Sequence, residues 1–305
     1  DIKAGRVKPG GSVGGKVGQT FGALGETSIE AAAREAAARL EAEAAHAERK
    51  AYLQLVAIGK ATAAFEQVKA AGLKDLDAVE ALIARDYTGR TNVESIEQRE
   101  TGMKAYYSRK LLGTWEALGN DFLGFFQDRQ KLYDLVRELR GEDSGNPLAK
   151  RGAKAFHDVA EEARQAFNNA GGDVGQLDDW GMPQHHSQEK VAAAGRDYWV
   201  DTMMGMVDRA RYVDDLGAPY DDARMREFLG KAWDTIATNG NANLEPGKSS
   251  GVGSRANRHA ESRQIHYKDA QTVIDYWNEF GERTAVEILL GHVETMARDV
   301  AFVEA

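Results

Sequence analysis

The sequence predicts an all-α protein in which a long, extended N-terminal helix precedes a multi-helix body with two irregular polar loops. Apolar residues recur at intervals of three and four over most of the 305 residues, which is the period of a helix. No alternating run of β-branched residues occurs beyond a weak strand-like indication at 263–267. None of the five prolines falls in the interior of an expected helix, as a helical chain requires, although Pro147 and Pro219 begin one.

The composition is that of a folded protein and excludes several classes of function. Hydrophobic residues make up 42% of the chain, charged residues 29%, and the net charge is −9. This acidic balance argues against broad, non-specific nucleic-acid binding, which needs Lys and Arg to neutralise phosphates, but it leaves a local basic patch open. The chain has no cysteine, so disulfides, thiolate catalysis and zinc ribbons are excluded, and any metal ligand has to be His, Asp or Glu.

Residues 1–26 are rich in glycine and are expected to form a flexible arm. The alternative is a weakly apolar segment that meets a membrane or a partner. This start is basic and lacks the apolar core of a signal peptide. No run of about 18 apolar residues occurs anywhere, so no transmembrane helix is expected. Because the first residue is Asp1, we expect processing or an excerpt of a longer polypeptide.

Residues 27–73 are expected to form one long, Ala-rich helix, which Thr27 or Ser28 begins and Gly72 ends. Its apolar stripe continues without interruption because each interval is three or four residues. Alanine lets helices approach closely, so the first half is interpreted as an oligomer interface; the alternative is a solvated spacer helix. The interface residues are Ala33, Ala36, Leu40, Ala44, Ala47 and Ala51. From Tyr52 onward the residues are large enough to join a core.

Residues 74–305 are expected to form the helical body, with a sub-boundary near 141–147 or 170–187 left open. Each expected helix follows a capping residue, a proline or a glycine turn. The expected helices are 76–87, 92–118, 121–140, 147–167, 187–213, 219–237, 270–280 and 283–303.

The polar loops at 178–190 and 239–268 contain the candidate site residues. A divalent metal is one interpretation, since imidazole and carboxylate suit zinc, manganese or iron. However, adjacent histidines point in different directions, and no His-x-x-x-His pair places two rings on one helical face, so the alternative is that the histidines make loop hydrogen bonds. The candidates are Asp178, Asp179, His185, His186, His259 and His266.

The second loop also contains a basic cluster in an acidic protein. It is interpreted as a contact for phosphate, nucleic acid or an acidic partner. The alternative is a set of local salt bridges with Glu261, Asp269 and Glu279, because charge runs of mixed sign are usually solvated faces. The cluster residues are Arg255, Arg258, Arg263, His266 and Lys268.

Two segments resemble helical regions of the internal virion, or ejection, proteins of short-tailed bacteriophages and of related large polyvalent phage and prophage proteins. The first is 180–191, with Pro-Gln-x-His at 183–186, and the second is 258–281, with Arg-x-Ile-x-Tyr-Lys-Asp-Ala at 263–270. The resemblance covers about residues 145–300. It implies a virion component that leaves with the genome and assembles into a conduit across the host envelope, and it supplies no catalytic residues.

The function expected from the sequence is therefore structural. The chain is expected to assemble with itself or with portal, tail or ejection proteins, to contact DNA or membrane, and to need no cofactor and no small-molecule substrate. It would be soluble and cytoplasmic during assembly, then lie inside the virion, and then be delivered to the host envelope. The alternatives are a metal- or phosphate-dependent enzyme that uses the histidine loops and a nucleic-acid-contacting module that uses the basic cluster.

Overall fold

The computed structural model describes residues 28–84, 91–119, 124–172, 174–175, 182–213, 218–240 and 265–304. Within these residues the all-α prediction is confirmed, because the chain forms ten α-helices and two short 3-10 helices. The β-structure of the described part consists of two isolated antiparallel β-bridges.

The long helix α2 spans Ser28–Ala70, as the sequence predicts. It ends because Gly72 has a φ of +89°, a left-handed conformation that glycine adopts at little cost. The chain then turns back into α3, Asp75–Ile83, which packs against the end of α2. Val68 of α2 is buried here with Ala78 and Ala81 of α3, so the α2–α3 turn has a small core of its own.

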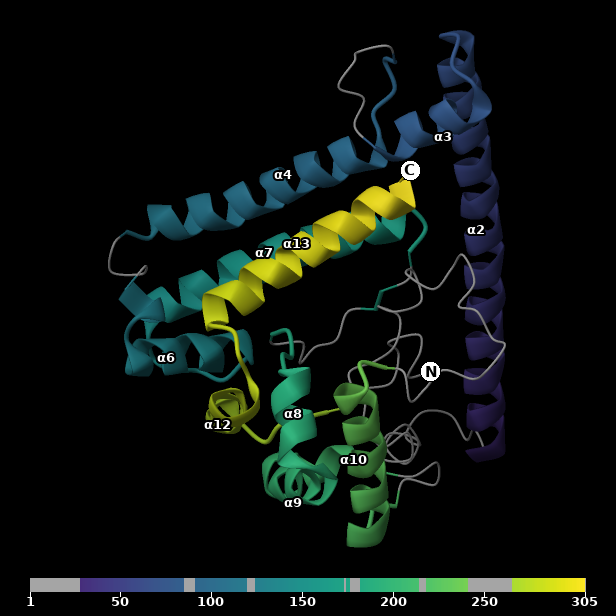
Figure 1. The fold of residues 1–305 in the computed structure, drawn as a ribbon. Coiled ribbons are helices and arrows are strands. Elements are labelled where there is room, and N and C mark those ends of the chain that lie inside the picture. Colours follow the sequence, from purple (N-terminus) through teal and green to yellow (C-terminus); the bar gives the residue numbers. More distant parts are fainter. Residues whose placement is uncertain are drawn as a thin grey trace.

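Three helices that are distant in sequence form the main layer of the body: α4 (Ile96–Ala117), α7 (Pro147–Asn169) and α13 (Ala285–Glu304). They lie side by side in Figure 1, and each packs on the other two. Trp115 of α4 and Phe156 of α7 are almost completely buried between them. The Trp115 Nε1 donates a hydrogen bond to the Gly152 carbonyl at 3.1 Å, so its polar group is satisfied inside the core.

The helix expected at 121–140 begins later than predicted, so that prediction is corrected. A 3-10 helix, Gly124–Phe126, comes first, and α6 spans Arg129–Leu139. Asp128 sets this start, because its carboxylate accepts hydrogen bonds from the backbone N–H groups of Gln130 and Lys131. α6 packs on α7 and closes one end of the main layer.

The prediction of a single helix at 187–213 is also wrong, because this segment forms two shorter helices. Gly195 has a φ of +80° and separates them. The second helix ends at Met206 because Val207 forms a β-bridge with Tyr267, a pairing that the weak strand indication at 263–267 partly anticipated. The remaining elements are α8 (Gln188–Ala194), α9 (Arg196–Met206), the 3-10 helix η2 (Arg209–Arg211), α10 (Asp222–Ala237) and α12 (Ala270–Phe280).

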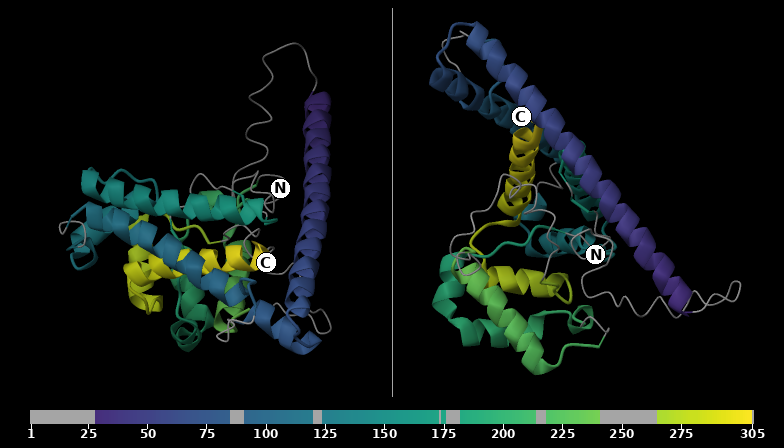
Figure 2. Two further views of the ribbon diagram at one scale, coloured as in Figure 1. Left: turned by 90° about the horizontal axis from the view of Figure 1, so that it is seen from above. Right: turned by 90° about the vertical axis from the view of Figure 1, so that its right-hand side faces the viewer.

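The body and α2 occupy different regions of the molecule. In Figure 1, α8, α9, α10 and α12 gather below the main layer, and one continuous hydrophobic core runs from α4 to α13. The two views of Figure 2 show α2 standing outside the body, with its Ser28 end far from the α3 turn. One long side of α2 therefore faces the body and the other faces outward.

Candidate functional site

The outward side of α2 exposes the apolar stripe that the sequence predicts. Leu40 is 61% exposed, Leu55 is 69% exposed and Ile58 is 63% exposed. The alanines between them, Ala44, Ala47 and Ala51, are also exposed. The side chains of Ala33 and Ala36 lie outside the described residues. A row of large apolar side chains in water is a typical mark of an interaction surface.

The opposite side of α2 holds the helix to the body. The Arg49 guanidinium donates a hydrogen bond to the Asn168 carbonyl at the end of α7, at 3.3 Å. Leu53 reaches the turn after α7, where a Cβ on Gly171 would stand 3.5 Å from the Leu53 Cβ. Because Arg49 and Leu53 lie half a helical turn away from Leu40 and Ile58, these contacts fix the stripe in its outward orientation.

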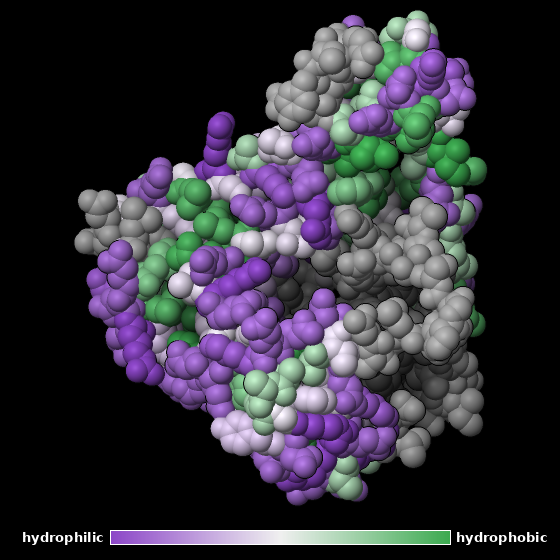
Figure 3. Space-filling model, viewed as in Figure 1, coloured by the Kyte–Doolittle hydropathy of each residue, from purple (hydrophilic) through white to green (hydrophobic). Residues whose placement is uncertain are grey.

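α3 carries a second exposed apolar face, which the sequence reasoning missed. Leu76 is 79% exposed, Val79 43% and Ile83 55%. Ala78 and Ala81, on the other side of this short helix, are buried. The spacing of three and four residues was the available signal, but it does not tell which face of α3 would be covered. Figure 3 shows hydrophobic residues gathered where α3 meets the end of α2.

The first polar loop is fixed to the segment around α12 by three hydrogen bonds. The Gln184 side-chain amide donates to the Ile265 carbonyl at 2.5 Å. The Ser187 N–H donates to the Phe280 carbonyl at 2.7 Å, and the Lys190 ammonium donates to the Gly281 carbonyl. Residues 184–190 and 265–281 therefore contact each other directly.

His186 packs inside this junction. Its ring meets the Tyr276 ring edge-on, with centroids 6.1 Å apart, and its Nδ1 lies 3.4 Å from the Tyr276 hydroxyl. Burial, with a smaller effect from His185, lowers the pKa of His186 from 6.5 to about 4. Burial also raises the pKa of Tyr276 to about 12. Both rings are therefore neutral at pH 7, with Tyr276 in the core and His186 partly buried beside it.

His185 points into a different environment. Its Nε2 is buried and has no hydrogen-bond partner among the described residues. Burial, followed by the positive charge of Arg283, lowers the pKa of His185, while Glu282 and Glu287 act in the opposite direction. The pair therefore diverges, as expected for adjacent residues in an extended backbone.

The second polar loop is described only at its end. His266 is 8% exposed, and its backbone N–H donates to the Tyr212 hydroxyl at 2.9 Å. Lys268 is exposed, and its ammonium binds the Gly205 carbonyl. The other candidates, Asp178, Asp179, His259, Arg255, Arg258 and Arg263, lie outside the described residues. Within the described ranges, no three His, Asp or Glu side chains converge as a metal site would need.

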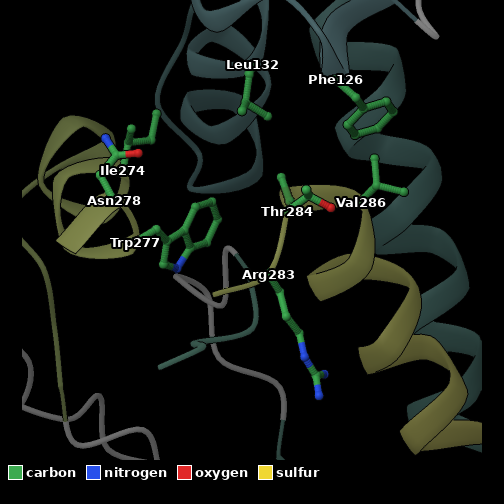
Figure 4. A pocket seen from close by; sticks show the side chains of 9 residues that line it. Phe126, Leu132, Ile274, Trp277, Asn278, Arg283, Thr284 and Val286 are labelled. Carbon is green, nitrogen blue, oxygen red and sulfur yellow. The ribbon is translucent and has the colours of Figure 1, made fainter. Parts of the chain in front are cut away.

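A pocket of about 200 Å³ lies at the turn between α12 and α13 (Figure 4). Trp277 and Ile274 of α12 face Leu132 of α6 across it, so its walls are mainly apolar. The Thr284 N–H and hydroxyl both donate to the Glu287 carboxylate, at 2.7 and 2.8 Å. The Thr284 donors are therefore already used by Glu287, and the charged side chain that lines the pocket is Arg283.

Comparison with protein-family models, with curated proteins and with solved structures finds no match to this chain. None of the helices described has both the length and the apolar content that a membrane span requires.

Proposed function

We propose that this chain is a structural assembly protein, namely an internal virion or ejection component of a short-tailed bacteriophage that helps to deliver the genome across the host envelope. It assembles through helix–helix contacts with itself and with portal, tail or ejection proteins. The observation that carries the assembly part is the exposed stripe of α2, in which Leu40, Leu55 and Ile58 are each more than 60% exposed.

The phage part rests on the resemblance of segments 180–191 and 258–281. The direct contacts of Gln184, Ser187 and Lys190 with Ile265, Phe280 and Gly281 support it, because the two segments then form one structural unit. The partly buried position of His186 supports a structural role for this loop, since its neutral ring packs against Tyr276.

The assembly is tested by measuring the mass of the chain with multi-angle light scattering over a range of concentrations. The native chain is expected to form a defined oligomer. The double substitution Leu55→Glu with Ile58→Glu should weaken association by at least about 100-fold, because burying each such side chain stabilises by about 1.5–3 kcal/mol. Ala45→Glu with Ala63→Glu adds the same charge at exposed positions of α2 outside the stripe, and it should leave the oligomer intact.

A monomer at every concentration would contradict the assembly proposal, as would equal effects of the two double variants. The virion assignment is tested by mass spectrometry of purified phage particles produced from the genome that encodes this chain. Peptides of the chain should be present in full particles and depleted in particles that have released their DNA. Their absence from full particles would overturn the assignment.

A further inference from the structure

We propose that the outward face of α2 pairs with the same face of a second copy of this chain, with the two helices antiparallel and the twofold axis close to Arg49. This inference rests on the proposed function, because it names the partner and the geometry of the α2 contact. The apolar spacing of the face and the charge distribution along the helix support it independently.

The exposed stripe is nearly symmetric about Arg49. Ala47 and Ala51 lie two residues before and after it, and Leu40 and Ile58 lie nine residues before and after it. In an antiparallel pair, Leu40 of one copy therefore meets Ile58 of the other, and Ala47 meets Ala51. A surface that repeats in this way on both partners is what a twofold interface requires.

Side-chain volume also favours the antiparallel arrangement. Ala44 and Leu55 lie five residues before and six residues after Arg49, so a large side chain of one copy meets a small one of the other. In a parallel pair, alanine would face alanine at three successive levels, from Ala44 to Ala51, whereas the antiparallel pair has two such levels, where Ala47 meets Ala51. Alternation of large and small side chains across an interface gives the denser packing.

The charge distribution along α2 also favours the antiparallel orientation. The half 28–48 contains five glutamates and two arginines, a net charge of −3. The half 49–70 contains four basic residues and one glutamate, a net charge of +3, although Arg49 binds the Asn168 carbonyl and Lys69 pairs with Asp75 of α3 within the chain. Antiparallel pairing places each acidic half beside a basic half, whereas parallel pairing in register places like charges together.

The helix dipole does not account for this distribution. The dipole favours acidic residues in the first turn and basic residues in the last turn, and its effect falls off within those turns. The change of sign in α2, however, occurs between Glu48 and Arg49, in the middle of a helix of 43 residues. The position of this change coincides with the centre of the apolar stripe.

The body leaves room for such a pair. Arg49 and Leu53 attach α2 to the body from the side opposite the stripe. Figure 2 shows α2 outside the body except at its end, where α3 packs against it, so two copies joined by their outward faces place their bodies on opposite sides of the pair.

The orientation is tested by disulfide cross-linking, which is simple because the chain has no cysteine. Residues 40 and 58 are separated by about 27 Å along α2, at 1.5 Å per residue, whereas a disulfide needs Cα atoms within about 7 Å. Under mild oxidation, an equimolar mixture of the Leu40→Cys and Ile58→Cys proteins should give a covalent dimer. Neither protein alone should do so. A mixture of Leu40→Cys with Ala63→Cys, an exposed position outside the stripe, is the control and should remain uncross-linked.

The light-scattering mass of the same samples separates the two proposals. Oligomers in which each single-cysteine protein cross-links with itself would overturn the antiparallel pair and leave the assembly proposal standing. Oligomers with no cross-link in any sample would also overturn the antiparallel pair. Monomers in all samples would overturn both proposals.

Discussion

Protonation of His186 should destabilise the body below pH 6.5. The ring is partly buried against Tyr276, which is itself completely buried, and the first polar loop is fixed there through Ser187 and Gln184. Charging His186 therefore places a cation beside the Tyr276 ring and next to His185. The perturbations are a change of pH and the substitution His186→Gln, which keeps a polar side chain and removes the titration.

The magnitude follows from the pKa values. Because the pKa of His186 is about 4 in the folded chain and 6.5 is its ordinary value, the unfolded chain binds the proton first as the pH falls. Stability contributed by the neutral ring is present above pH 6.5 and is lost as the pH falls toward 4. The loss is about 2 kcal/mol between pH 7.5 and pH 5 and approaches about 3 kcal/mol below pH 4, at roughly 1.4 kcal/mol for each pKa unit.

Between pH 6.5 and pH 5, the loss of stability from protonation of His186 can be measured apart from the loss caused by protonation of carboxylates. Hydrogen bonds from Arg164 and Lys110 lower the pKa values of Glu161 and Glu162. The stability that these two carboxylates contribute to the folded chain is therefore lost only below about pH 4.5. His185, whose pKa is also lowered, contributes in the same window and with the same sign.

The assay is urea unfolding followed by tryptophan fluorescence and circular dichroism, at fixed protein concentration, for the native chain and for His186→Gln between pH 7.5 and pH 5. The native chain should lose about 2 kcal/mol more than the variant over this range. Parallel curves for the two proteins would refute the reasoning, because they would show that His186 has the same pKa in the folded and unfolded chain.

Two further predictions concern the backbone and a helix cap. Gly195→Ala should destabilise the body by about 1–2 kcal/mol, because Gly195 has a φ of +80°. Gly113→Ala, at an exposed position of α4, should instead stabilise it by about 0.5–1 kcal/mol. Urea unfolding of the two variants measures the change in the free energy of unfolding, which should be opposite in sign. Equal effects would contradict the argument from backbone strain. Asn146→Ala should cost about 1 kcal/mol, because the Asn146 side chain accepts hydrogen bonds from two backbone N–H groups of α7, whereas Asn169→Ala at the exposed other end should cost less. Thermal unfolding compares the two, and an equal loss would show that the cap contributes nothing.

The sequence predicted those features of the fold that depend on neighbouring residues. Asp221 and Asp269 cap α10 and α12, and Pro147 begins α7, because each signal acts within one helical turn. The sequence-based prediction was wrong where a helix end depends on contact with a distant segment. The helix that begins after Gly195 ends at Met206 because Val207 pairs with Tyr267, sixty residues later, and the weak strand indication at 263–267 does not tell which segment Tyr267 pairs with.

The same distinction applies to the candidate surfaces. The apolar stripe of α2 can be recognised from the sequence. Its outward orientation cannot, because it depends on the hydrogen bond from Arg49 to the Asn168 carbonyl, between residues 119 positions apart. The role of His186 depends on Tyr276, which is 90 positions away. The exposed face of α3 was missed because a short amphipathic helix shows which residues are apolar but not which neighbour will cover them.

α2 gives the strongest physical reason to expect a partner. A helix that is long and mostly alanine, glutamate and arginine has high intrinsic propensity, but most helical stability in proteins comes from packing an apolar face. α2 contacts the body through Arg49 and Leu53, and it contacts α3 through Phe65 and Val68. Its largest apolar side chains between Leu40 and Ile58 are left in water. Antiparallel pairing would bury this face, and hydrogen exchange should therefore slow along 40–58 as the protein concentration rises.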